Sequence, residues 1–280
     1  MNNYIKSPLN FTGGKYKLLP QILPLFPEKI NTFVDLFGGG FNVGINVKKC
    51  DKVIYIDNNE YVVDILRTFK LYSIGYTLEI IDSYIKRYNL SKTNKEGYLA
   101  LRNYYNKAPV GNDLLIYTLI CYAFNNQIRF NSKGEYNVPF GKREFNSSLR
   151  EKLVEFIKEL HNKDIIFMNE DFRNILSEYK YKFNKDDFVY IDPPYLNSIA
   201  TYNEQKGWTK EYEIDLLSCL DKLDEQGIKF ALSNNLKYNN PFLDEWKDKY
   251  NVHYLNGDYS NCNYQKKDKS KDIEVLITNY

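Results

Sequence analysis

The chain has 280 residues, enough for one large domain or for one domain with a substantial insertion. It is 43% hydrophobic and 26% charged, which is typical of a globular protein with a sizeable core. No apolar run approaches the ~20 residues that a membrane-spanning helix needs, and a net charge of +2 does not by itself indicate a nucleic-acid-binding protein.

Cysteine and histidine residues are few and scattered. The sequence contains no Cys-x-x-Cys pair, and its two histidines are far apart. This argues against a disulfide framework, a zinc site and a Ser-His-Asp triad. The first residues, Met-Asn-Asn-Tyr-Ile-Lys, lack the apolar stretch of a signal peptide, so we expect a reduced, cytoplasmic protein without metal or membrane attachment. The cysteines are Cys50, Cys121, Cys219 and Cys262.

The first quarter of the chain has the pattern of a nucleotide-binding α/β unit. An apolar strand is expected over 32–37, broken by three glycines at 38–40, and a short helix is expected to start within 41–47. A second strand over 53–57 ends in Asp57, and a helix follows from about 58 to 71.

The pattern then changes twice. Residues 76–124 are helical in periodicity, whereas 125–143 gain Gly, Asn, Pro and basic residues and are expected to form a hairpin or long loop. The α/β alternation resumes after a helix over 147–160. Strands are expected at 164–168, 187–192, 228–233, 252–255 and 273–278, with helices at 209–226 and 240–249. We therefore expect an α/β fold with a parallel-type sheet, interrupted by a mostly helical insertion from about 74 to 147.

The glycine turn and Asp57 form one candidate site. Glycines allow a sharp turn and a close approach of the backbone to a ligand, and a carboxylate about twenty residues later can accept both ribose hydroxyls of an adenosine-type ligand. A tight turn with a helix-capping aspartate explains the same residues. Phe41 and Asn42 depart from the dinucleotide fingerprint G-x-G-x-x-G, so NAD is not favoured.

The second candidate site is Asp192-Pro193-Pro194-Tyr195, which follows the apolar run 188–191. Two prolines fix the chain as it leaves the strand, so the carboxylate, the Pro193 carbonyl and the Tyr195 ring are expected to face one pocket. An exocyclic amine of a nucleobase needs two acceptors for its N–H groups and an aromatic face for its ring. A rigid turn at the strand exit is the alternative.

Several motifs in order resemble the Dam-type DNA adenine-N6 methyltransferases of the D12 class, most closely the phage-type members. They are Asn10-Phe11-Thr12-Gly13-Gly14-Lys15, Asp35-Leu36-Phe37-Gly38-Gly39-Gly40 and Asp192-Pro193-Pro194-Tyr195. Residues 137–143 are similar to that family's recognition hairpin, and 232–234 to a later core motif. The resemblance extends from about Leu9 to Asn279.

The resemblance implies a Rossmann-like, S-adenosylmethionine-dependent methyltransferase sheet with a target-recognition insertion. Residues 1–73 and 148–280 would form the catalytic domain, and 74–147 the helical target-recognition domain with its DNA-reading hairpin at about 125–143. The implied reaction is methyl transfer to a flipped adenine in double-stranded DNA, in GATC or a related GAT-containing site, by a monomer. The implied target amine would contact Asp192, with Tyr195 stacked on the base.

The resemblance also implies a set of binding residues. The catalytic set is Asp192, Pro193, Pro194 and Tyr195. The residues implied to contact the cofactor are Phe11, Lys15, Phe37, Gly39, Asp57, Asp171, Phe172 and Asp192. Those implied to contact DNA are Asn10, Asn125, Asn126, Gln127, Arg129, Pro139 and Arg143, with Arg129 reading a base.

The sequence departs from the family pattern at three positions. Asn10 replaces a lysine that reads an outer guanine in some bacterial members, and Gln127 replaces an apolar residue beside the flipped base in others. Phe41 replaces the last glycine of F-x-G-x-G, as phage-type members also allow. The first two departures concern the target sequence more than the chemistry.

The charge of residues 125–150 agrees with a DNA role, because basic side chains outnumber acidic ones five to two there. A solvated surface loop has the same composition. Lysines at 266–271 are expected at an exposed hairpin tip. Cytosine-N4 methylation, methylation of RNA or of a protein glutamine, and a catalytically idle DNA-binding relative are the alternatives. Asp192 argues against the methylation alternatives, and the intact site argues against the idle relative.

Overall fold

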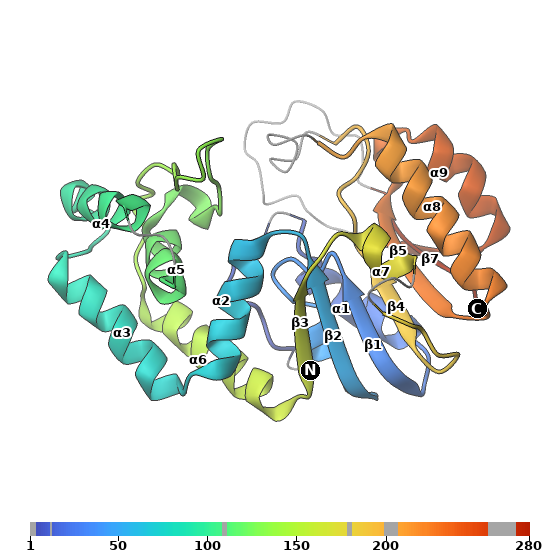
Figure 1. Cartoon of the computed structure of the whole chain (residues 1–280), viewed down its shortest axis with the longest axis horizontal. Helices are drawn as coiled ribbons and strands as arrows, with labels where there is room; N and C mark the ends of the chain where they lie inside the picture. The colour runs from blue at the N-terminus through green and yellow to red at the C-terminus, as the bar shows by residue number, and fades with distance from the viewer. Residues whose placement is uncertain (1–3, 12, 108–110, 178–180, 199–206, 257–272) are drawn as a thin grey trace. The chain divides into compact units, whose positions relative to one another are not determined.

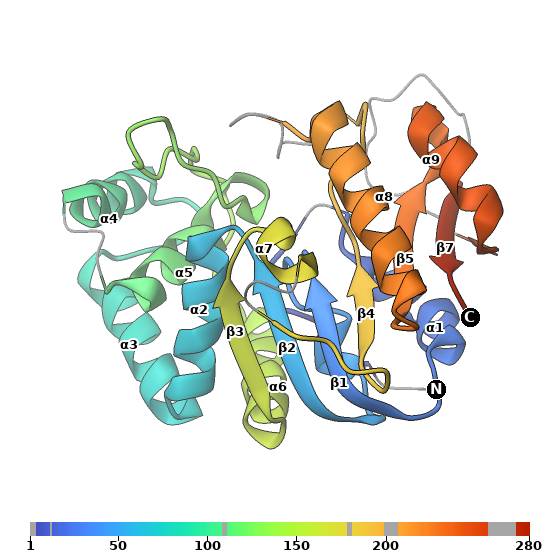
Figure 2. The same cartoon turned by 45° about the vertical axis from the view of Figure 1, so that its right-hand side comes forward.

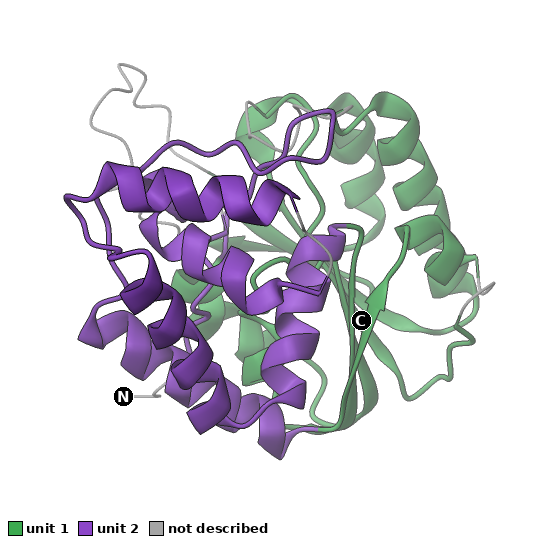
Figure 3. Cartoon of the chain, turned by 60° about the vertical axis from the view of Figure 1, so that its left-hand side comes forward, with its two compact units in different colours: residues 1–4, 15–58, 164–280 green, residues 5–14, 59–163 purple. Residues whose placement is uncertain are grey.

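The computed structural model describes residues 4–11, 13–107, 111–177, 181–198, 207–256 and 273–280. The chain divides into two compact units (Figure 3). Unit 1 contains residues 1–4, 15–58 and 164–280, and unit 2 contains residues 5–14 and 59–163. Cys262 and the lysines of 266–271 lie outside the described residues.

Unit 1 is built on a sheet with the strand order β3-β2-β1-β4-β5-β7-β6 (Figure 1). The strands from β3 to β5 are parallel, so their carboxyl ends lie along one edge (Figure 2). β7 is antiparallel to both of its neighbours. The strands are β1 (Ile30–Leu36), β2 (Cys50–Asp57), β3 (Ile165–Asn169), β4 (Phe188–Ile191), β5 (Lys229–Asn235), β6 (Asn251–Leu255) and β7 (Glu274–Thr278).

The central strands of unit 1 are apolar because they are covered on both faces. All four residues of β4 are buried, as are the last five of β1. Val34 and Val189 of these strands belong to one core cluster with Leu216 and Leu220 of α8. The helices of unit 1 are α1 (Leu19–Ile22), α7 (Phe172–Leu176), α8 (Lys210–Glu225) and α9 (Pro241–Trp246), with short 3-10 turns at η1 (Lys15–Leu18), η2 (Leu23–Leu25), η3 (Gly44–Asn46), η6 (Leu236–Tyr238) and η7 (Lys247–Lys249).

The expected α/β class is confirmed, with two differences in detail. The short helix expected to start within 41–47 is only the 3-10 turn η3. β7 lies between β5 and β6 and is antiparallel to both, so the sheet is not parallel throughout. An apolar run predicts a buried strand but contains no information on its direction or its neighbours, which is why the pattern missed this arrangement.

Unit 2 is helical and is organised around α5 (Asp113–Tyr122). Residues 114–122 of α5 are all buried, because α2, α3 and α4 pack against this helix. The other helices are α2 (Glu60–Leu71), α3 (Ile74–Arg87), α4 (Lys95–Lys107) and α6 (Ser147–Asn162), and η4 (Phe124–Asn126) is a 3-10 turn after α5.

The boundaries of unit 2 differ from those expected at about 74 and 147. The sequence predicts α2 and α6 in the catalytic domain, but they pack against each other, and α2 packs on α5. Lys70 of α2 also donates hydrogen bonds to the carbonyls of Leu160 and Lys163, at 2.7 and 2.8 Å. The apolar faces of α2 and α6 therefore contribute to the helical core, and unit 2 extends from 59 to 163.

Candidate functional site

The glycine turn after β1 is held by the end of β2. The N–H of Gly39 donates a hydrogen bond to Oδ2 of Asp57 at 2.9 Å, and the Tyr55 hydroxyl donates to the Gly39 carbonyl at 2.8 Å. Phe37 and Gly39 both have positive φ angles, of 61° and 49°. A Cβ on Gly38 would lie 2.4 Å from Cε2 of Tyr55, so only glycine allows this close approach. The turn thus presents backbone and one carboxylate at the carboxyl edge of the sheet.

Phe41 occupies its unusual position by filling the core. Its φ of 61° is rare for a bulky residue, but its ring is fully buried and packs on the rings of Tyr55 and Phe167, at 5.2 and 5.9 Å. Gly44 makes room for it, since a Cβ there would lie 2.3 Å from the Phe41 ring. Packing therefore compensates the backbone cost at the position where the family pattern has its last glycine.

Three aromatic rings lie together next to this turn. Phe37, Phe172 and Trp208 have pairwise ring-centroid distances of 5.4 to 5.6 Å. Trp208 also donates a hydrogen bond from its indole nitrogen to the buried Glu213. Phe37 is half-buried, whereas Phe172 is only 4% exposed. Sequence analysis missed Trp208, because no motif surrounds it.

Asp171 is the N-cap of α7, and its carboxylate is paired with Arg173. Oδ1 accepts hydrogen bonds from the backbone N–H and from Nε of Arg173, both at 2.9 Å, and Oδ2 lies 2.8 Å from Nη2. These hydrogen bonds from the guanidinium lower the pKa of Asp171. The residue implied to reach a cofactor is thus fixed by a neighbour that the sequence did not single out.

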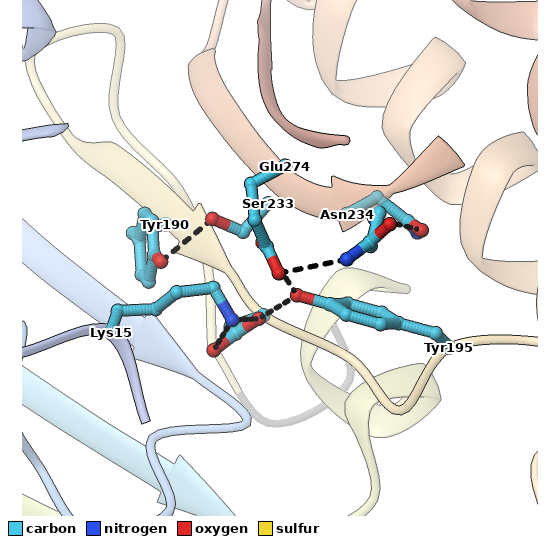
Figure 4. A network of polar contacts seen from close by, with 8 residues as sticks. Lys15, Tyr190, Tyr195, Ser233, Asn234 and Glu274 are labelled. Atoms are coloured by element: carbon cyan, nitrogen blue, oxygen red, sulfur yellow. Dashed lines mark hydrogen bonds and ion pairs between the residues drawn. The ribbon is translucent and has the colours of Figure 1, made fainter. Parts of the chain in front are cut away.

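Asp192 and Lys15 form a partly buried ion pair in unit 1, and Figure 4 shows Lys15 in this cluster. Nζ of Lys15 lies 2.7 Å from Oδ1 and 2.9 Å from Oδ2 of Asp192. The lysine side chain is 3% exposed, whereas the aspartate side chain is 20% exposed and is therefore open on one side. Burial raises the pKa of Asp192, and the charge and hydrogen bond of Lys15 oppose that rise. The sequence predicts that Lys15 borders the cofactor, and the structure shows that it pairs with the Asp192 carboxylate.

Tyr195 completes this cluster. Its hydroxyl lies 3.3 Å from Oδ1 of Asp192, and Nζ of Lys15 lies 5.2 Å from its ring centroid. The backbone N–H of Asp192 donates to the Leu36 carbonyl at 3.3 Å, which ties the start of the tetrapeptide to β1. Asp192, Lys15 and Tyr195 are thus brought together although Lys15 lies far away in the sequence.

The residues implied to contact DNA lie in unit 2, in and around the loop after α5. Asn125 and Asn126 have positive φ angles of 52° and 51°, and Nδ2 of Asn10 donates to the Asn125 carbonyl at 2.9 Å. Nδ2 of Asn126 donates to the Ile120 and Cys121 carbonyls at the end of α5. Asn10, Asn125, Pro139 and Arg143 are exposed, and Asn126, Gln127 and Arg129 are half-buried.

The loop after α5 is held by hydrogen bonds from α4 and from one of its own side chains. Tyr98 and Arg102 of α4 both donate to the Val138 carbonyl, at 2.8 and 3.1 Å. Within the loop, Arg129 donates from Nε to Oδ1 of Asn137 at 2.9 Å and from Nη2 to its carbonyl at 3.3 Å. Two isolated bridges, Ala123–Phe140 and Phe130–Tyr136, give the loop a hairpin-like course.

Metal-ligand clusters and membrane-spanning helices are both absent from the described residues. In that part of the chain no group of three or more His, Cys, Asp or Glu side chains could hold a metal ion. Within the same described ranges, no helix is long and apolar enough to cross a membrane.

Comparison with known proteins decides the family. The model of the D12 class N6 adenine-specific DNA methyltransferases matches residues 11–261. The chain belongs to this family. It is 49% identical over 288 residues to type II methyltransferase M.FokI of Planomicrobium okeanokoites and 43% identical over 293 residues to modification methylase StsI of Streptococcus sanguinis. These alignments cover 100% and 99% of this chain, but only 43% of the length of each relative.

A shorter relative of the D12 chain is the DNA adenine methylase of Escherichia coli K12. It is 26% identical over 253 residues, which cover 88% of this chain and 86% of that protein. Members of the D12 class use S-adenosylmethionine as methyl donor. The site fits this donor chemically: Asp57 and Asp192, at the carboxyl ends of β2 and β4, are acceptors for hydroxyl and ammonium groups, and the glycine turn lies directly against Asp57.

Proposed function

We propose that this D12 chain methylates N6 of adenine in double-stranded DNA, with S-adenosylmethionine as donor. The observation that supports this most strongly is the position of Asp192: its carboxylate is fixed by Lys15, lies beside Tyr195 and is open on one side. Such an acceptor next to an aromatic ring suits an exocyclic amine of a base.

Residues of unit 1 would hold the donor. Asp57 would accept hydrogen bonds from the ribose hydroxyls, and Gly39 and Phe37 would line the pocket, with the aromatic group of Phe37, Phe172 and Trp208 beside it. Lys15 and Asp171 of unit 1, and Phe11 of unit 2, are further proposed contacts. The bound donor supplies an electrophilic methyl group on a sulfonium.

The chain's own residues orient the amine. Asp192 and the Pro193 carbonyl would accept its two N–H groups, which favours the pyramidal geometry of an attacking nitrogen, while Pro194 limits the freedom of the turn and Tyr195 stacks on the base. The ionised carboxylate of Asp192 also stabilises the positive charge that develops on nitrogen. Catalysis would therefore depend on positioning and on hydrogen-bond acceptors.

The adenine must leave the double helix to reach Asp192, at a cost of a few kcal/mol. We propose that the loop of unit 2 contacts the DNA around it, with Asn10, Asn125, Asn126, Gln127, Pro139 and Arg143 at the contact and Arg129 reading a base. We further propose a GAT-containing target such as GATC, a monomeric enzyme and a cytoplasmic site of action. Mass measurement by light scattering tests the monomer.

The test is methyl transfer from tritiated S-adenosylmethionine to plasmid DNA from a methylation-free host, followed by mass spectrometry of the nucleosides. We expect N6-methyladenine with the wild-type chain and none with Asp192→Ala. Asp186→Ala, an exposed aspartate of the same unit, is the matched control and should stay active. N4-methylcytosine, or N6-methyladenine made by D192A, would contradict the proposal.

A further inference from the structure

A second buried carboxylate lies beside Tyr195. Glu274 is the first residue of β7 and is 5% exposed. It lies beyond residues 11–261, which the family model matches, and no motif of the sequence singled it out. Its Oε2 is 3.5 Å from the Tyr195 hydroxyl oxygen. Figure 4 shows the Glu274 carboxylate facing this hydroxyl.

The Tyr195 hydroxyl therefore lies between two carboxylates. It is 3.3 Å from Oδ1 of Asp192 and 3.5 Å from Oε2 of Glu274. A phenol has one proton to donate, so it serves one of these carboxylates at a time. The two distances are similar, so rotation about the C–O bond can exchange the acceptor of the hydroxyl proton.

The sheet fixes Glu274 in this place. Its other oxygen, Oε1, accepts a hydrogen bond from Nδ2 of Asn235 at 3.0 Å, and the two residues are register partners on β5 and β7. Oδ1 of Asn235 in turn accepts from the backbone N–H groups of Lys237 and Ile273, at 3.0 and 3.3 Å. Glu274 is thus a fixed acceptor rather than a mobile surface group.

We propose that Glu274 is a positioning residue that accepts the Tyr195 hydroxyl when the target amine binds Asp192. This inference rests on the proposed adenine methylation. Oδ1 of Asp192 already accepts from Lys15 at 2.7 Å, so a hydroxyl on the same oxygen competes with an incoming N–H. When the Tyr195 hydroxyl donates its hydrogen bond to Glu274 instead, Oδ1 of Asp192 is left to accept from the amine. The hydrogen bond to Glu274 also keeps the Tyr195 ring fixed for stacking.

The first test is Glu274→Gln in single-turnover methylation of unmethylated plasmid DNA. A glutamine has one acceptor oxygen, so it cannot accept from Asn235 and Tyr195 through separate oxygens. We expect a rate about three- to tenfold lower, with unchanged affinity for S-adenosylmethionine and DNA. Glu225→Gln, exposed on α8, is the control. In a Tyr195→Phe background, E274Q should have no further effect.

The second test is the exchange variant that combines Asn235→Asp with Glu274→Gln. Its new carboxylate on β5 accepts from the new side-chain amide on β7, which leaves the amide oxygen to Tyr195, so we expect the rate to recover. This variant keeps every hydrogen bond and therefore also tests the inference if E274Q alone does not fold.

Three results overturn the inference while leaving the proposed function intact: an E274Q rate equal to wild type, an equal loss of rate in the Y195F background, or a folded exchange variant that is inactive. A wild-type chain that transfers no methyl group to adenine overturns the proposed function, and this inference with it.

Discussion

The ammonium of Lys15 contacts both carboxylate oxygens of Asp192, at 2.7 and 2.9 Å, from 177 positions away in the sequence. The lysine is almost fully buried, so the pair is protected from solvent on the lysine side and open only at the aspartate. A buried charge without its partner is costly, so each member of this pair depends on the other. Lys15 thereby stabilises Asp192 in the ionised form that the proposed chemistry needs.

Replacing Lys15 by methionine should move the acid limb of the pH–rate profile to higher pH. Activity needs ionised Asp192 and is lost as pH falls through its pKa, which burial already places above the usual 3.8. Without the opposing lysine that pKa rises further, so the acid limb should move to higher pH. Single-turnover rates across pH test this.

Lys15→Arg keeps the charge and should retain most of the wild-type profile, and Lys17→Met, on an exposed neighbour, should leave it unchanged. The raised pKa of Asp192 also affects stability. An ionised, partly buried Asp192 without a partner destabilises the fold, so K15M should lose stability as pH rises above about 4 and Asp192 ionises. An acid limb that stays in place in K15M would show that Lys15 does not set the state of Asp192.

Asp57→Ala should weaken binding of S-adenosylmethionine about 10- to 100-fold, because the carboxylate both supports the Gly39 N–H and is proposed to accept the ribose hydroxyls. Asp57→Asn retains an acceptor for Gly39 and should lie between D57A and wild type. Titration calorimetry measures both. Asp51→Ala, exposed on the same strand, is the control. If D57A binds S-adenosylmethionine with wild-type affinity, Asp57 does not contact the donor.

Gly38→Ala should destabilise the protein by about 1–3 kcal/mol, because the new Cβ would lie 2.4 Å from the buried Tyr55 ring. Gly75→Ala on α3 is the matched change, since a Cβ there meets nothing within 4 Å. It should be neutral or slightly stabilising, within about 1 kcal/mol. Denaturant unfolding compares the two, and equal effects would contradict the packing of the glycine turn.

Arg129→Ala should reduce discrimination at one base pair by about 1–3 kcal/mol. Asn137→Ala should have a smaller effect at the same base pair, because Asn137 holds the Arg129 guanidinium at 2.9 Å. Binding to a panel of duplexes with single base changes measures this, with exposed Lys133→Ala as the control. If R129A weakens binding to all duplexes equally, Arg129 contacts phosphate and does not read a base.

The sequence predicted the part of the site that follows local pattern. Asp57 and Asp192 each end an apolar run, and because parallel strands share an edge, such residues are expected on one side of the sheet. The α/β class and the family motifs followed from the same runs and turns.

The rest depends on contacts between distant segments. The Lys15–Asp192 pair and the approach of Glu274 to Tyr195 arise from the placement of η1 and β7, which no local periodicity encodes. Likewise, α2 and α6 show only amphipathic patterns, and these do not tell which core their apolar faces join. Tertiary packing decided these features.

The most direct measurement is single-molecule methylome sequencing of DNA from a methylation-free host that expresses this chain, with the D192A variant alongside. The account predicts N6-methyladenine at one short motif with the wild-type chain and none with D192A. Unmethylated DNA from cells that contain a folded, S-adenosylmethionine-binding chain would contradict it.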